Sequence, residues 1–112
     1  MSRCLTCDPR SCRPSYLYVI WDDHRQAVKI GRTVNIGQRT ASYRANGNHH
    51  LTREHSRVAG CEWSASTRED KALRLLAARA ERLRGDWFHA DIETAIECVE
   101  AACAGYAGKR WK

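Results

Sequence analysis

The sequence predicts an α+β domain in which a small, antiparallel, three-stranded β-sheet is flanked by helices, in the order β-β-α-β-α-α. Residues 16–21 and 27–32 alternate in the manner of strands, and a short polar turn separates them. Residues 35–45 and 67–84 show helical periodicity instead. The chain has 112 residues, 43% of them hydrophobic, which suits one domain with a modest core.

The hairpin is the clearest local signal. Aromatic and branched side chains alternate along the first strand, with Tyr16, Tyr18 and Ile20 on one face and Leu17, Val19 and Trp21 on the other. Residues 22–26 form the polar turn, and Val28 and Ile30 resume the alternation. Adjacent antiparallel strands are therefore expected at the start of the domain.

The first helix is expected at residues 35–45. Asn35 is a good N-cap, and Ile36, Thr40 and Tyr43 then share one face. Arg39 lies on that face, about 60° from Ile36 at about 100° per residue. An arginine turned toward a core requires an explanation.

A second helix is expected at 67–84, after a partly exposed third strand at 50–60. Its apolar line contains Leu73, Leu76, Ala80 and Leu83, and Glu69 lies on the same line. Glu69 therefore points inward or at the floor of a cleft. The alternative is that Ser66 and Glu69 form a capping box, in which the glutamate needs no further role.

Three segments divide the chain. Residues 1–15 form a cysteine-containing arm, 16–104 the folded domain, whose last helix is capped by Asp91, and 105–112 a basic tail. There is no apolar run of about 20 residues and no signal sequence, so we expect a cytoplasmic protein without membrane association.

The charge balance favours a nucleic-acid partner. The net charge is +6, and 15 of the 19 basic residues are arginine, whose guanidinium group binds phosphate through two parallel hydrogen bonds. The alternative is a genome rich in G and C, which enriches arginine and alanine together.

The chain has six cysteines. Without a secretory signal, they do not predict a disulfide framework. Cys4, Cys7 and Cys12 supply three thiolates within nine residues, which could hold a structural Zn²⁺ if a distant residue supplied the fourth ligand. The alternative is a plain N-terminal arm.

Five elements in order resemble the small phage and bacterial branch of the GIY-YIG nuclease superfamily. Residues 16–18 stand in place of its first motif and residues 29–31, Lys-Ile-Gly, in place of its second. Arg39 and Glu69 follow at similar positions, and 85–88 read Gly-Asp-Trp-Phe where that branch has Gly-Glu-Trp-Phe. Lys29 replaces the tyrosine of the superfamily's name-giving motif, although this branch favours Val-Lys-Ile-Gly, the sequence of residues 28–31. Leu73 and Leu76 depart from the histidine and phenylalanine that are typical of the branch.

The resemblance implies a catalytic set of Tyr18, Lys29, Arg39 and Glu69. Glu69 would hold Mg²⁺ or Mn²⁺, Arg39 would stabilise developing charge, and Tyr18 would orient or deprotonate water. Lys29 would act as a base or hold phosphate. Asp70 could replace Glu69 as ligand if the helix began one residue later, and Tyr16 could replace Tyr18.

From these features we expect a DNA-binding protein that acts as a divalent-metal-dependent endonuclease. Arg32, Arg39 and Arg44 are the expected contacts to duplex or branched DNA, and a homodimer is possible. A non-catalytic DNA-binding module with the same fold is the alternative. A third possibility is a protein-interaction domain made basic by genome composition.

Overall fold

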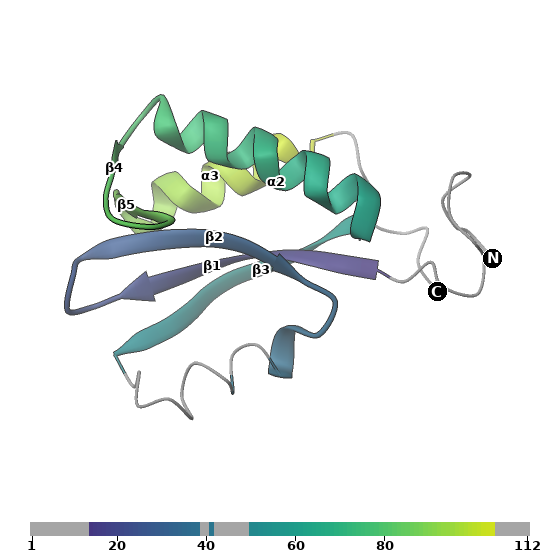
Figure 1. Cartoon of the computed structure of the whole chain (residues 1–112), viewed down its shortest axis with the longest axis horizontal. Helices are drawn as coiled ribbons and strands as arrows, with labels where there is room; N and C mark the ends of the chain where they lie inside the picture. Colours follow the sequence, from purple (N-terminus) through teal and green to yellow (C-terminus); the bar gives the residue numbers. More distant parts are fainter. Residues whose placement is uncertain (1–13, 39–40, 42–49, 105–112) are drawn as a thin grey trace.

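The computed structural model describes residues 14–38, 41 and 50–104. Five strands form one antiparallel sheet: β1 (Pro14–Asp22), β2 (Ala27–Thr33), β3 (Leu51–Cys61), β4 (Glu81–Arg82) and β5 (Trp87–His89). Their spatial order is β3-β1-β2-β5-β4. Two helices, α2 (Glu62–Ala77) and α3 (Ile92–Ala102), cover one face of the sheet, and the helical residues 36–38 lie on the other (Figure 1).

The expected α+β class and antiparallel sheet are confirmed, but three strands were too few. The two additional strands come from residues 81–89, where β4 pairs with β5 and β5 pairs with β2. Gly85 turns this short hairpin at a φ of 72°, a backbone conformation that suits glycine. The helix expected at 67–84 instead ends at Ala77, although Ala80 and Leu83 continue its apolar period.

Helix α2 also begins five residues earlier than expected. Its N-cap is Cys61, the last residue of β3, and no side chain caps the helix. Gly60 has a φ of 98°, so the chain turns from strand into helix at a residue that tolerates left-handed geometry. Ser66 and Glu69 therefore lie inside the helix, and the capping-box interpretation of Glu69 is wrong.

Strand β1 lies between β3 and β2 in the sheet and is buried on both faces along its middle. Leu17 and Val19 pack under α2 and α3, whereas Tyr18 and Ile20 contact the opposite layer. None of these four side chains is more than 2% exposed. The alternation of side chains that predicted the hairpin is therefore confirmed, but both faces of β1 are covered by other parts of the protein.

The helix-side core contains mostly small and aliphatic side chains. It joins Val28 and Ile30 of β2 to α2 and α3, whose buried members are Ala65, Ala72, Leu76, Ala95, Cys98, Val99 and Ala102. Asp91 caps α3 as expected, its carboxylate accepting the Thr94 N–H at 2.8 Å. No helix in the described part of the chain is long and apolar enough to cross a membrane.

Gly31 is required for space rather than for backbone conformation. It is paired with Tyr18 across the β1–β2 ladder. A Cβ atom on Gly31 would lie 2.4 Å from the Tyr18 hydroxyl oxygen, well inside van der Waals contact. The tyrosine ring thus lies directly over the glycine, on the face opposite the helices.

Gly31→Ala should therefore destabilise the protein by about 1–3 kcal/mol, because the Tyr18 ring must leave its packed position. Gly37→Ala is the control, since the nearest atom would lie 3.9 Å from its new Cβ. That variant should be unchanged or more stable by up to about 1 kcal/mol. Urea denaturation measures both, and equal stability of the two variants would contradict the close approach of Tyr18.

Candidate active site

Glu69 occupies an apolar position on α2. Ala65, Ala72 and Leu76 form the buried stripe of this helix at spacings of seven and four residues, and each is 0% exposed. Glu69 lies on that stripe, four residues after Ala65 and three before Ala72, with its side chain 22% exposed. A carboxylate therefore stands at the helix–sheet boundary where packing alone would select an alanine or leucine.

Arg32, near the end of β2, is the partner of this carboxylate. Its Nε donates a hydrogen bond to Glu69 Oε1 at 3.2 Å. Arg32 faces the helices because Val28 and Ile30, which precede it at even spacing, pack into the helix-side core. Sequence reasoning gave Arg32 a role in DNA contact but did not pair it with Glu69, because 37 residues separate the two.

Burial dominates the electrostatics of Glu69. Desolvation is the largest single effect and raises the pKa of this carboxyl above its ordinary value, while the charge and the hydrogen bond of Arg32 act in the opposite direction. The negative charges of Asp70 and Asp86 raise it further. Ionisation of Glu69 is therefore less favourable in the folded protein than in the unfolded chain.

Glu100 shows the opposite balance. It accepts hydrogen bonds from Arg57 and from the His55 ring, which reach it from β3. Desolvation alone would raise the pKa of Glu100, but these two partners lower it below its ordinary value. Both glutamates pair with an arginine, yet only Glu69 is destabilised in its charged form. Such a perturbation marks a candidate functional group.

Tyr18 and Lys29 lie on the other face of the sheet. Tyr18 is 2% exposed and packs with Ile20, Leu51, Ile36 and Trp87. Lys29 is half-buried, is paired with Ile20 of β1 and Trp87 of β5, and shares the face of Tyr18. Tyr16 lies on this face as well and is half-buried.

The two faces meet at the edge of β2. Strand β5 pairs with β2 only at Val28 and Lys29. Among the described residues, no strand covers the outer edge of β2 beyond that point. Tyr18 lies over Gly31 on one side of this edge, and Arg32, the next residue, binds Glu69 on the other.

Several expected site residues lie outside the described part of the chain. They are Arg39, Arg44, Cys4, Cys7 and Cys12. The position of Arg39, the Arg44 contact and the zinc site therefore stay predictions, whereas Tyr18 and Glu69 do not share one face of the sheet. Asp70, the alternative ligand, is exposed on α2 next to Glu69.

A metal ion at Glu69 would have few protein ligands. Within the described ranges, no three His, Cys, Asp or Glu side chains come together in a metal-binding group. Mg²⁺ often binds through one or two carboxylates and keeps several waters, with substrate phosphate completing its octahedron. Glu69, half-buried and held in place by Arg32, fits that mode of binding and does not fit a closed protein cage.

The fold and this edge define a small, basic α+β domain in which the carboxylate of Glu69, whose pKa is raised, lies at the boundary between sheet and helices. The chain belongs to the T5orf172 domain family, whose model matches residues 15–103. This is a phage-associated family of nuclease-like domains. Searches of curated proteins and of solved structures find no match.

The family match corrects the expected membership of the GIY-YIG superfamily. The T5orf172 domain is a different family, a distinct endonuclease-like domain, so the five resembling elements led to the wrong family. Each of those elements was short, and two of them, residues 29–31 and 85–88, already departed from the motifs they resembled.

The two glutamates should respond to pH with opposite signs. The folded-state pKa of Glu69 is raised, so its contribution to stability falls as pH rises through that pKa, and Glu69→Gln should gain melting temperature relative to wild type with increasing pH. The pKa of Glu100 is lowered, so its stabilisation is present above the unfolded-state pKa and is lost as pH falls.

Glu100→Gln should therefore melt below wild type near neutral pH and converge with it in acid. Thermal melts of the three proteins from about pH 3 to pH 7 measure both trends. If the two variants shifted in the same direction at every pH, the contrast between the sites would be refuted.

Proposed function

We propose that this chain binds DNA and cleaves its phosphodiester backbone with one divalent cation held at Glu69. The observation that carries the proposal is the position of Glu69, a carboxylate on the buried stripe of α2 with a raised pKa. Membership of a nuclease-like family and the net charge of +6 support DNA as the partner.

In this proposal each residue has a role that follows from its place at the β2 edge. Glu69 would supply one carboxylate oxygen to the cation, and water and phosphate oxygens would complete its coordination. Arg32 orients that carboxylate through its Nε–H and places positive charge where a phosphate would approach. The cation supplies charge neutralisation at the pentavalent phosphorus.

The other face contributes positioning. Tyr18, which is 2% exposed on the face opposite Glu69, would support the β2 edge at Gly31 without contacting the attacking water, and Lys29 on the same face would hold a neighbouring phosphate. Arg39 remains a proposed stabiliser of developing charge. A strand passing along the open edge of β2 would be within reach of both faces.

A second candidate is a DNA-binding module that does not cleave. It is favoured by one observation, the hydrogen bond that already engages Glu69 Oε1. In that case Arg32 and Glu69 form a structural ion pair between β2 and α2, and the arginine-rich surface alone contacts the DNA. The two candidates differ in whether Glu69 is needed for cleavage.

Glu69→Gln separates them. Supercoiled plasmid incubated with wild type and Mg²⁺ or Mn²⁺ should be nicked, and the variant should lose about 10²-fold or more in rate, because the amide cannot hold the cation. DNA affinity should stay constant or rise, since a negative charge near phosphate has been removed.

Glu97→Gln is the matched control. Glu97 also pairs with an arginine, Arg79, at 2.9 Å, but it is exposed on α3. Its loss should leave nicking unchanged. Wild type that binds plasmid without nicking it under either cation would establish the second candidate instead.

DNA binding should also depend strongly on salt. Each phosphate neutralised by a basic side chain releases counterions, so log affinity should fall linearly with log salt, with a slope of about −0.9 per contact on duplex DNA. Fluorescence anisotropy across a salt series measures the slope. A flat response would exclude a phosphate-binding surface and favour the protein-interaction alternative.

A further inference from the structure

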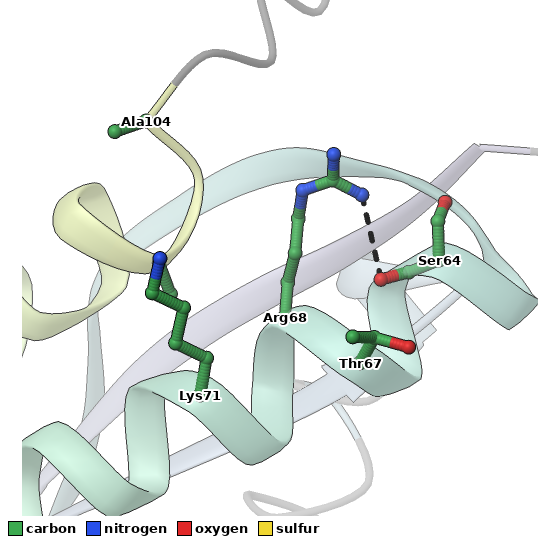
Figure 2. A pocket seen from close by; sticks show the side chains of 6 residues that line it. Ser64, Thr67, Arg68, Lys71 and Ala104 are labelled. Atoms are coloured by element: carbon green, nitrogen blue, oxygen red, sulfur yellow. Dashed lines mark hydrogen bonds between the residues drawn. The ribbon is translucent and has the colours of Figure 1, made fainter.

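A cleft between α2 and the end of α3 lies on a different side of α2 from the buried stripe. Its volume is about 390 Å³, and its lining consists of Ser64, Thr67, Arg68, Lys71, Ala102 and Ala104. Ser64, Arg68 and Lys71 follow one another at helical spacing, about 100° around α2 from the line that contains Glu69. Figure 2 shows Arg68 and Lys71 extending from the same side of the helix.

The chemistry of this lining is selective for anions. Its described residues present a guanidinium, an ammonium and two hydroxyls, and none of them carries a carboxylate. The Arg68 guanidinium is held in place, because its Nη1 donates to the carbonyls of Ala59 and Ser64 at 3.3 and 3.4 Å (Figure 2 draws the second bond). Guanidinium and ammonium groups beside hydroxyls are the usual partners of phosphate oxygens.

The volume of the cleft and the residue types that line it limit the class of ligand further. Small-molecule sites begin at about 300 Å³, so the cleft has room for more than one phosphate ion. None of the six described residues that line the cleft is aromatic, so none of them offers a ring on which a base could stack. Recognition would then rest on phosphate and sugar, without preference for a base.

We propose that this cleft binds a phosphoryl group carried by a nucleic-acid strand or a nucleotide, as a second phosphate site separate from Glu69. It rests on DNA binding as proposed above only for the strand as source, and it does not require cleavage. A strand held here as well as at the β2 edge would cross α2, which gives the domain a longer footprint than one site provides.

A purely structural role for Lys71 is the alternative to phosphate binding, and the test must distinguish the two. The last turn of α3 contains no basic residue, and its carbonyls carry partial negative charge. An ammonium from α2 could serve that helix end and bind no ligand. Such a role predicts a loss of stability without any loss of phosphate binding.

The experiment is an NMR titration of the ¹⁵N-labelled full chain, without divalent cation. The probes are thymidine, dTMP, dAMP, inorganic phosphate, and the tetranucleotide dT₄ with and without a 5′-phosphate. The amide signals of Ser64, Thr67 and Lys71 should shift saturably with dTMP and dAMP alike, and should not shift with thymidine.

Variants assign the binding to the cleft. Lys71→Gln should weaken dTMP binding by about tenfold, the effect of one charge-assisted hydrogen bond. Arg84→Gln, which removes an equal charge from the exposed β4–β5 turn, should leave it unchanged. Glu69→Gln should also bind dTMP normally, so failure of cleavage at Glu69 and failure of this site are distinguishable.

The tetranucleotides identify the source. Tighter binding of dT₄ than of dTMP, with or without its 5′-phosphate, indicates a strand, and tighter binding of dTMP indicates a free nucleotide; either supports phosphoryl recognition. Absence of saturable shifts with every phosphate-bearing probe would overturn the proposal. So would a Lys71→Gln protein that melts lower but binds dTMP as wild type does.

Discussion

The packing of α2 across β1 and β2 is the constraint on which the rest of this structure depends. Ala65, Ala72 and Leu76 are fully buried there and fix how the helix is rotated against the sheet. Once that rotation is set, Glu69 must enter the same boundary, because it lies on the same line of the helix. Burial then disfavours its ionised form, Arg32 acts in the opposite direction, and the pKa remains above its ordinary value. A carboxylate kept at such a cost is typical of functional sites.

The same rotation gives α2 two charged sides with different chemistry. One side holds Glu69 against the open edge of β2, where an acidic group meets Arg32. The other side presents Arg68 and Lys71 to the cleft beside α3, where none of the described lining residues is acidic. The first arrangement suits a cation and a reacting phosphate, and the second suits a phosphate that is only held. If both proposals hold, a nucleic-acid strand contacts the domain on both sides of α2.

The sequence predicted those features of the fold that depend on local periodicity. The β1–β2 hairpin, the third strand and the Asp91 cap follow from alternation and cap chemistry. The ends of α2 did not follow, because Cys61 gives no capping signal and Leu83 continues the apolar period beyond the true end. The inward position of Glu69 was predictable, whereas its pairing with Arg32 depends on the tertiary fold. The family could not be decided from short motifs, each of which is compatible with more than one family.

Binding of a divalent cation by Glu69 is tested most directly by paramagnetic broadening with Mn²⁺. Substoichiometric Mn²⁺ added to the ¹⁵N-labelled chain should broaden the amide signals of residues 31–33 and of α2 around Glu69, which lie on either side of the carboxylate. Glu69→Gln should abolish this broadening, while Glu97→Gln should preserve it. Broadening that persists in Glu69→Gln, or that centres on another part of the chain, would contradict a cation site at Glu69.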